Sequence, residues 1–317
     1  MKVGLSGFGS IGNRHVSNLL RLGIRDIILF REKGKGNSLG LTEVYDYSQF
    51  ADSDRDYFII CNPTSNHLSK IEPLLTRNRN VLVEKPLVGN EEECNKVETL
   101  LKKYSGKGMV AYNMRFHPCL KRIKEICGSG MLGKTYSVRF YVGQYLPDWR
   151  PGQEYSKGVS ALKSLGGGVI LELIHEIDMA VFLFGNPDSG IQSLAGKVSD
   201  LEIETEDISE IIFRTSSGTI VSVHQDYLSR DYRRTIEILA AEGSLFCDLK
   251  TATIKITGPS GKIILDEAIT FERNDMYLSL IRYYTDCIET GKRPSPDLEE
   301  SFASLRIALE AKKSNNL

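Results

Sequence analysis

The sequence predicts an α/β chain of two parts: an N-terminal doubly wound parallel sheet, then a domain built on an open-faced, largely antiparallel sheet. In the first third of the chain, apolar runs alternate with helical periods, which indicates a parallel sheet with crossover helices. In the second half, strand-like runs follow one another across glycine turns, which indicates antiparallel hairpins. We expect domains at residues 1–117 and 118–317, with the last helix able to pack back on the first domain.

The first domain is expected to begin with a strand over residues 2–6, a glycine turn over 7–12 and a helix over 14–22. The helix is predicted from the spacing of Val16, Leu19 and Leu20. Further strands and helices then alternate. The expected strands cover residues 26–30, 56–61, 80–83 and 108–113, and the expected helices begin near 66 and cover 91–104.

The character of the sequence changes after His117. We expect a helix over 119–127, a long strand over 136–145 and one continuous helix from about 168 to 184. Alternating patterns then predict the sheet of the second domain. Its expected strands cover residues 210–215, 219–227, 233–240, 244–249, 253–257 and 262–266, and helices over 277–290 and 298–313 follow.

Composition narrows the class of partner. Forty basic and 41 acidic side chains give a net charge of −1, so no overall field favours nucleic acid or an anionic membrane. No apolar run approaches the roughly 18 residues of a membrane helix. The six scattered cysteines are expected to be free thiols, and the N-terminal residues lack a secretory pattern. We therefore expect a cytoplasmic protein that acts on a small molecule.

Glycines at positions 7, 9 and 12 form the pattern G-x-G-x-x-G directly after a strand and at the start of a helix. Small residues there let backbone amides approach a pyrophosphate at the positive end of the helix. The alternative is a tight turn with no ligand. The preferred interpretation is a dinucleotide site in a Rossmann domain, made by Gly7, Phe8, Gly9, Ser10, Ile11 and Gly12.

The second strand bears on the choice of cofactor. An acidic residue about 20 positions after the glycines usually binds the adenosine ribose of NAD, but this strand ends in Phe30-Arg31-Glu32. A guanidinium at Arg31 could pair with the 2′-phosphate of NADP. NADP is therefore modestly favoured over NAD. In the alternative, Glu32 binds the ribose and Arg31 is a solvated loop residue.

Several motifs with separate places in the chain point to one family. They are VLVEKPL (81–87), CNPTSNH (61–67), YNMRFHP (112–118) and GGGVILELIHEID (166–178), with DYLSRDYRRTIEIL and a C-terminal ETGKRPSPDLEESFASLRIALEAKKS. Together they resemble the glucose-fructose oxidoreductase and inositol dehydrogenase family, known as Gfo/Idh/MocA, over nearly the whole chain. The resemblance implies a Rossmann domain that holds the cofactor and an open-faced sheet domain that holds the substrate.

The resemblance also implies a catalytic group of a lysine, an acid and a histidine. Lys85 matches the lysine of the E-K-P motif, His175 the histidine, and Glu172 stands near the family's aspartate. Glutamate replaces aspartate, and the spacing to the histidine is three residues instead of four. On one helix a spacing of three still keeps both side chains on one face. Glu172 could instead be a charge at a helix end.

General chemistry gives these residues roles. An imidazole can take a hydroxyl proton while hydride leaves the same carbon, which is the role expected of His175. An ammonium beside the reacting oxygen stabilises developing negative charge, which is the role expected of Lys85. Without the family match, His175 would be read as a structural histidine.

Other residues are expected to contact cofactor or substrate. The cofactor set adds Asn62, Pro63, Thr64, Asn66, His67, Glu84, Lys85, Asn113 and Arg115, and the substrate set holds Lys85, Tyr145, Trp149, Arg150, His175 and Arg233. Helix capping is the alternative for Asn66 and His67, and loop packing for the aromatic residues. One of the neighbours Arg233 and Arg234 must point away from the substrate. No histidine or cysteine spacing indicates a metal.

We therefore expect an NAD(P)-dependent dehydrogenase or reductase that acts on a CH–OH group of a sugar, an inositol or a nucleotide-linked sugar, with a weak preference for polysaccharide biosynthesis. A non-catalytic NAD(P)-binding regulator is one alternative. An enzyme of imines or dihydrodiols on the same fold is another, because fold does not fix substrate. A homo-oligomer, either dimer or tetramer, is expected because an open sheet face tends to be covered by a second copy.

Overall fold

A computed structural model describes residues 1–34 and 36–317 in two compact units. The first unit is Met1–Asn113 with Arg273–Phe302, and the second is Met114–Glu272 with Ala303–Leu317. The sequence placed everything after residue 117 in the second domain, whereas helix α8 (Arg273–Thr290) groups with the first unit. Contacts with α1 explain this grouping: Arg14 lies 4.5 Å over the ring of Tyr277, and the Asn18 and Asn274 amides bond each other.

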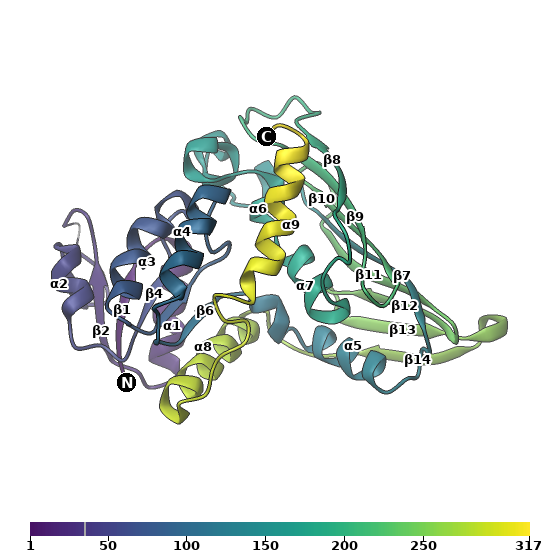
Figure 1. Ribbon diagram of the computed structural model, residues 1–317, viewed down its shortest axis with the longest axis horizontal. Helices are drawn as coiled ribbons and strands as arrows, with labels where there is room; N and C mark the ends of the chain where they lie inside the picture. The colour runs from purple at the N-terminus through teal and green to yellow at the C-terminus, as the bar shows by residue number, and fades with distance from the viewer. Residues whose placement is uncertain (35) are drawn as a thin grey trace. The chain divides into compact units, whose positions relative to one another are not determined.

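The first unit holds a six-stranded sheet of order β3-β2-β1-β4-β5-β6, and every pair in it is parallel. This order is that of a doubly wound Rossmann sheet, as expected, with its switch point between β1 and β4. The strands are β1 (Lys2–Ser6), β2 (Asp26–Phe30), β3 (Thr42–Val44), β4 (Tyr57–Ile60), β5 (Val81–Val83) and β6 (Gly108–Val110). The helices are α1 (Ser10–Arg21), α2 (Tyr47–Asp52), α3 (His67–Thr76), α4 (Glu91–Leu101) and α8 (Figure 1).

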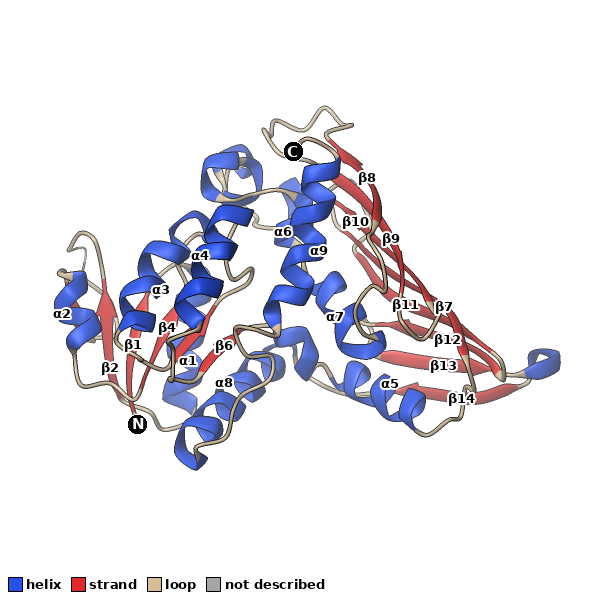
Figure 2. Cartoon of the chain, in the orientation of Figure 1, coloured by secondary structure: helices blue, strands red, loops and turns tan. Residues whose placement is uncertain are grey.

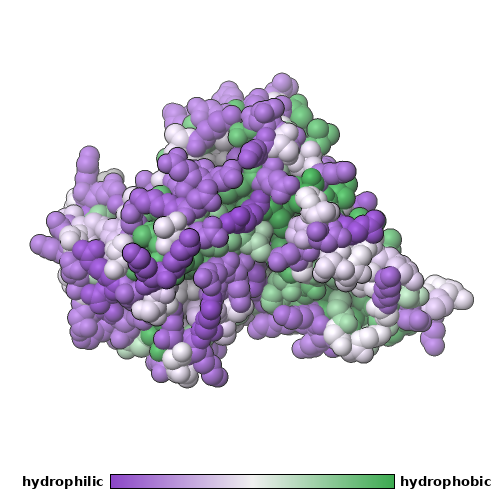
Figure 3. All heavy atoms as spheres, viewed as in Figure 1, coloured by the Kyte–Doolittle hydropathy of each residue, from purple (hydrophilic) through white to green (hydrophobic). Residues whose placement is uncertain are grey.

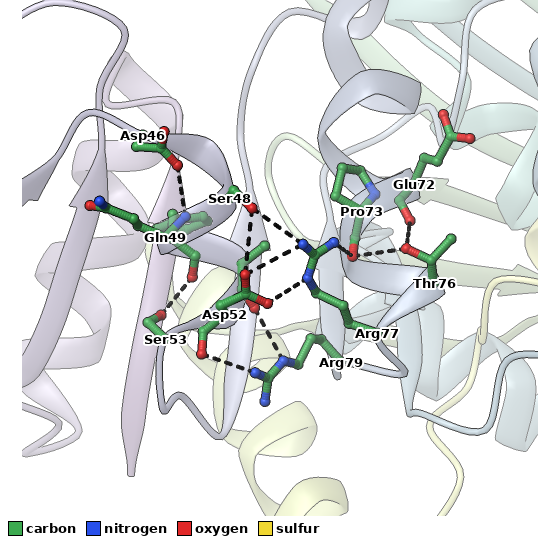
Figure 4. Close-up of polar contacts among 12 residues, drawn as sticks. Asp46, Ser48, Gln49, Asp52, Ser53, Glu72, Pro73, Thr76, Arg77 and Arg79 are labelled. Atoms are coloured by element: carbon green, nitrogen blue, oxygen red, sulfur yellow. Dashed lines mark hydrogen bonds and ion pairs between the residues drawn. The ribbon is translucent and has the colours of Figure 1, made fainter.

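Strand β3 and helix α2 were missed in the sequence because both are short and depend on distant partners. Helix α2 is capped by Asp46, which accepts from the Gln49 N–H at 2.8 Å. Its last residue, Asp52, accepts from the Arg77 Nε at 2.6 Å, and the Arg79 guanidinium donates to the Ala51 carbonyl (Figure 4). Arginines beyond the end of α3 therefore hold a helix of six residues that has little stability alone.

The second unit holds an eight-stranded sheet of order β14-β13-β12-β11-β7-β10-β9-β8. All neighbours are antiparallel except β7 and β10, which are parallel. The sheet is thus largely antiparallel, as expected. Its strands are β7 (Thr135–Gly143), β8 (Gln192–Gly196), β9 (Ile208–Arg214), β10 (Ile220–Asp226), β11 (Arg233–Ala240), β12 (Gly243–Asp248), β13 (Thr253–Thr257) and β14 (Ile263–Ala268). Strand β8 was not expected.

Helices cover one face of this second sheet, as Figure 2 shows. They are α5 (Pro118–Gly128), α6 (Val169–Glu172), α7 (His175–Phe184) and most of α9 (Ser301–Ser314). Strand residues that point to them, such as Phe140 and Val223, are fully buried. Residues with the opposite parity are exposed, among them Ile212, Leu239 and Phe246. On the side seen in Figure 3, hydrophilic side chains dominate the first unit, and apolar patches are wider over the second.

Three general properties complete the description. Across residues 1–34 and 36–317, no helix is long and apolar enough to cross a membrane. The six cysteines are free thiols, five of them buried. In the same residues, no group of three or more His, Cys, Asp or Glu side chains is arranged to hold a metal ion.

Candidate functional site

The glycine turn between β1 and α1 is shaped by two close approaches and one open position. A Cβ on Gly12 would lie 2.0 Å from the Gly7 carbonyl oxygen, and Gly7 has a φ of +91°. A Cβ on Gly9, the N-cap of α1, would meet no described atom within 4 Å, and no side chain of the described residues caps this helix. Packing therefore requires Gly7 and Gly12, whereas Gly9 leaves the positive helix end open to an anionic ligand.

Arg31 follows β2, and its side chain is held at the sheet edge. Its amide N–H donates to the Val44 carbonyl at 3.0 Å, and its guanidinium lies 5.6 Å over the Phe8 ring. One Nη is 3.8 Å from Glu43 Oε1. Hydrogen bonds from Asn37 and Tyr45 lower the pKa of Glu43, so this carboxylate is ionised at neutral pH. A 2′-phosphate at Arg31 would therefore also meet a negative charge.

Glu32, the alternative ribose ligand, is exposed beside the same corner. Its carboxylate lies 3.4 Å from the Lys70 ammonium, which also sits over the rings of Phe30 and Tyr47. Its side chain is 69% exposed. Glu32 is thus available to a ligand, but it carries a lysine partner that a ribose would have to share.

The lysine of the E-K-P motif follows β5 in a turn with buried polar neighbours. Glu84 is 9% exposed, and one of its oxygens lies 2.7 Å from Nε2 of the fully buried His15. The other oxygen accepts from the Lys85 N–H at 3.3 Å. On the far side of the turn, His67 Nδ1 lies 2.8 Å from the Pro86 carbonyl oxygen. His15 was not singled out in the sequence.

The β4–α3 connection adjoins this turn. The Ser6 hydroxyl donates to the Asn62 side chain at 2.7 Å, which links the ends of β1 and β4 at the switch point. Pro63 caps a short 3-10 turn that contains the buried Thr64. Asn66 precedes α3 without a side-chain capping bond from the described residues, so the capping alternative for this residue is wrong. Asn113 is 5% exposed, beyond the end of β6.

The expected helix over 168–184 is wrong in one respect that affects the site: it is two helices, α6 and α7, broken at Leu173 and Ile174. The amide of buried Gln225 on β10 donates to the Leu173 carbonyl at 2.6 Å and so replaces the lost helical hydrogen bond. Glu172 ends α6 and His175 begins α7, so the argument that they share the face of one helix does not hold. Glu172 accepts from the Ser160 hydroxyl at 2.7 Å.

Two bidentate ion pairs hold the first turn of α7. Glu176 accepts from Arg234 at 2.6 and 2.9 Å, and Asp178 accepts from Arg115 at 2.8 and 2.7 Å. All four side chains are at most 12% exposed. His175, 9% exposed, lies at the start of the same turn. The pairs thus fix the backbone that carries the histidine.

These pairs alter two expectations. Arg115, expected at the cofactor, has its guanidinium bound to Asp178. On β11, Arg234 points to the helical face that carries His175. Strand residues alternate, so Arg233 points to the open face, where it lies 6.0 Å from the Tyr141 ring. Arg233 thus points away from the face that carries His175, and a contact between Arg233 and the substrate stays a prediction.

The loop after β7 forms a small pocket with an aromatic wall. Its lining includes Trp149, Arg150, Tyr155 and Ser160. The Trp149 indole donates to the Gln144 carbonyl at 3.1 Å and packs edge-on against Tyr227. Ser160 connects this pocket to Glu172. Tyr145 lies outside the lining, where Arg230 stacks 3.5 Å from its ring.

Two family profiles match the chain, each over a separate range. Residues 1–112 match the oxidoreductase family with an NAD-binding Rossmann fold, and residues 120–246 match the Gfo/Idh/MocA C-terminal domain. The chain belongs to the Gfo/Idh/MocA family. Members are oxidoreductases, and this protein is an NAD(P)-dependent oxidoreductase of that type. The glycine turn with its open Gly9 fits such a cofactor.

Individual relatives are distant but extend over the full length of the chain. Myo-inositol 2-dehydrogenase of Thermotoga maritima is 24% identical over 99% of this chain and 96% of its own. Among solved Gfo/Idh/MocA-like structures, levoglucosan dehydrogenase in complex with NADH aligns with a TM-score of 0.87 at 18% identity over 99% and 98% of the two chains. UDP-N-acetylglucosamine 3-dehydrogenase of Acidithiobacillus ferrooxidans aligns with a TM-score of 0.81 at 18% identity over 99% and 97%. These structures support the fold.

Proposed function

We propose that this Gfo/Idh/MocA protein oxidises or reduces a carbinol carbon of a sugar, an inositol or a nucleotide-linked sugar, with Lys85 and His175 as its catalytic residues. The observation that carries the proposal is the glycine turn: Gly9 leaves the N-terminus of α1 open, at the switch point of a doubly wound sheet. Relatives named for inositol, levoglucosan and a UDP-linked amino sugar support the substrate class.

The proposed reaction balances a hydride and a proton. Bound nicotinamide supplies the hydride acceptor for oxidation. As the carbinol carbon loses hydride, the His175 imidazole takes the hydroxyl proton and a carbonyl forms. The Lys85 ammonium stabilises the negative charge that develops on the oxygen. The ion pairs of Glu176 and Asp178 hold the backbone of His175 in place for that transfer.

Glu172 and the pocket after β7 are proposed to contribute to substrate binding. The Ser160 hydroxyl donates to Glu172 and also lines the pocket with Trp149 and Arg150. An aromatic ring beside a guanidinium suits the apolar face and the hydroxyl or phosphate groups of a sugar derivative. In this proposal the Glu172 carboxylate accepts hydrogen bonds from hydroxyl groups of the substrate, as it does from Ser160.

For the cofactor, we propose that Arg31 contacts the 2′-phosphate of NADP and that Glu43 limits the resulting gain in affinity. The guanidinium suits a phosphate, but the ionised Glu43 carboxylate is only 3.8 Å away. NADP in preference to NAD thus stays a prediction. The rest of the cofactor set, Asn62, Pro63, Thr64, Asn66, His67, Glu84 and Asn113, is proposed from the family match and its place at the ends of β4, β5 and β6.

Self-association is proposed through the open face of the second sheet. Apolar side chains are exposed there, with Leu194 at 76%, Leu239 at 56% and Phe246 at 45%. Exposed apolar side chains of this kind are typical of a protein interface. A Phe246→Asp variant should shift the protein to monomer in sedimentation; an unchanged mass would argue against this face.

The location in the cell is proposed from the cysteines. The free thiols support a cytoplasmic location.

The experiment that tests the function begins with binding. Energy transfer from Trp149, the sole tryptophan, and from the tyrosines to NADH or NADPH gives both dissociation constants. Turnover is then screened with inositols, levoglucosan and UDP-linked sugars. Lys85→Met and His175→Asn should each lower kcat by about 10² to 10⁴-fold, the usual size of acid–base and electrostatic contributions.

The outcomes separate the alternatives. Cofactor binding with no turnover of any CH–OH compound would favour the non-catalytic regulator. Turnover of imines or dihydrodiols alone would replace the substrate class. Full activity of the Lys85→Met variant would refute the proposed mechanism. If the unmodified protein binds neither NADH nor NADPH, the role of the glycine turn is refuted.

A further inference from the structure

Two buried histidines flank the turn that presents Lys85, and they come from different helices. We infer that His15 and His67 are positioning residues for Lys85: His15 fixes the Glu84 carboxylate before it, and His67 fixes the backbone carbonyls after it. The inference rests on the role proposed for Lys85 and assigns residues outside the acid–base group.

His15 has one polar function in this fold. It lies on α1, three residues after Gly12, and is fully buried. Its Nε2 is 2.7 Å from Glu84 Oε1, and its Nδ1 has no hydrogen-bond partner in the described part of the chain. A polar ring in an apolar site costs free energy unless it is hydrogen-bonded. The contact with Glu84 is therefore the interaction that offsets the cost of burying a histidine ring at this position.

Glu84 passes this contact to the lysine. Its second oxygen accepts from the Lys85 N–H at 3.3 Å, so the carboxylate bridges the His15 ring and the backbone of Lys85. The Glu84 N–H continues the ladder from β5 by donating to the Ile60 carbonyl at 2.9 Å. A buried carboxylate that loses one partner must move or take up another donor. Removal of His15 thus acts directly on the residue that precedes Lys85.

His67 holds the other end of the turn. Nδ1 lies 2.8 Å from the Pro86 oxygen and 3.2 Å from the Leu87 oxygen, and Nε2 lies 2.9 Å from the Asn62 oxygen. Carbonyl oxygens only accept, and a neutral imidazole has one N–H, so only the protonated ring donates on both sides. Burial lowers the pKa of His67, while these carbonyls and the Glu84 carboxylate oppose that shift.

The position of the turn matters because the lysine side chain is long and flexible. Its ammonium is carried on a four-carbon stem, so the start of that stem is set by the residues on either side. A displacement of about 1 Å at a reacting group can lower a rate by roughly 10²-fold. Two histidines that fix Glu84 and Pro86 therefore restrict where the ammonium of Lys85 can reach.

The test reads Lys85 directly and needs no substrate. Reductive methylation with ¹³C-formaldehyde labels the lysines, and a Lys85→Arg protein identifies the Lys85 signal by its loss. We expect His15→Leu to move that signal towards the position of the exposed dimethyl-lysines, and His15→Gln, whose amide can still donate to Glu84, to keep it. Asn18→Leu is the control, since Asn18 lies on the same helix, is equally buried and bonds Asn274 instead.

His67→Leu should move the same signal, and the wild-type signal should change with pH below 6.5 while that of His67→Leu does not. An unchanged Lys85 signal in folded His15→Leu and His67→Leu proteins would overturn the inference, as would an equal change in Asn18→Leu. Binding of NADH and NADPH is measured on unmethylated samples of the same proteins. If the unmethylated wild type binds neither cofactor, the proposed function is refuted, and the Lys85 signal still decides the roles of the histidines.

Discussion

The glycine turn of the first unit and the histidine helix of the second are held in different ways. The turn between β1 and α1 is set by backbone contacts over six residues, with Gly7 and Gly12 packed against each other. The start of α7 is set by side chains from elsewhere in the chain, namely Arg115, Gln225 and Arg234. The residues that shape the turn thus lie in one short motif, which is a local constraint. The residues that hold the start of α7 are spread over more than a hundred positions, which is a distributed constraint.

The largest effect is expected at the local constraint. Gly12→Ala places a Cβ 2.0 Å from the Gly7 carbonyl, so it should destabilise the fold by more than about 4 kcal/mol. Gly9→Ala meets no described atom, so stability should change by less than about 1 kcal/mol while the dissociation constant for NADH rises about tenfold. Urea unfolding and NADH titration measure both. Equal effects at the two glycines would remove the distinction between packing and ligand approach.

Arg234→Met tests the distributed constraint at the start of α7, and it is expected to lower the free energy of unfolding. This change leaves the buried Glu176 carboxylate without its bidentate partner, which typically costs about 3–5 kcal/mol. The neighbouring Arg233→Met, on the open face, should cost less than about 0.5 kcal/mol. Chemical denaturation distinguishes them. Similar losses in both variants would mean that the ion pair does not hold the start of α7.

A smaller effect is expected at the sheet edge of the first unit. Glu43→Gln removes the negative charge beside Arg31, so the dissociation constant for NADPH should fall by roughly tenfold and that for NADH should stay within about twofold. Glu32→Gln is the matched control, because Glu32 pairs with Lys70 instead. Fluorescence titration gives the ratio of the two constants. A parallel change for both cofactors would place the adenosine 2′ position away from Arg31.

The smallest expected effect is on the pH dependence of folding stability, and it is compared at one histidine from each unit. Burial lowers the pKa of His67 below 6.5, so the unfolded chain binds the proton more readily, and stability should fall as pH drops through the window below 6.5. At His224, burial is outweighed by the Asp226 and Glu210 carboxylates, which raise the pKa. Its contribution is present below 6.5 and is lost as pH rises through the raised pKa.

Melting temperatures across pH 5 to 8 for His67→Gln and His224→Gln check these signs. Relative to the wild type, the first variant should lose stability less steeply as pH falls, and the second should lose less as pH rises. Profiles that run parallel to the wild type would show that neither proton is linked to folding.

The sequence could predict what is local. The parallel sheet of the first unit, the glycine turn and the largely antiparallel sheet of the second unit follow from apolar periods and turn residues, and all three are confirmed. The break between α6 and α7 could not be seen, because the apolar pattern from Val169 to Phe184 continues through it and its hydrogen-bond partner, Gln225, lies 52 residues beyond Leu173. The acids Glu176 and Asp178 in an apolar helix were the available signal for buried arginine partners.

The same limit applied to single side chains. Adjacent arginines on a strand differ only in parity, which is set by register against β7 and β12. The sequence alone could therefore not assign Arg234, and not Arg233, to the helical face. His15 and Glu84 meet across 69 residues. Their contact requires the packing of α1 against the end of β5, which no short pattern encodes.

The parallel pairing of β7 with β10 has a consequence for folding. The two strands can pair only after the intervening chain, residues 144–219, has been closed into a loop, and that loop contains α6, α7 and the pocket after β7. Closing so long a segment is entropically costly and is typical of slow, late steps. We therefore expect β7 and β10 to pair in the same folding step in which α7, the helix that carries His175, packs on them. A chain whose sheet is incomplete would then also lack the folded α7 around His175.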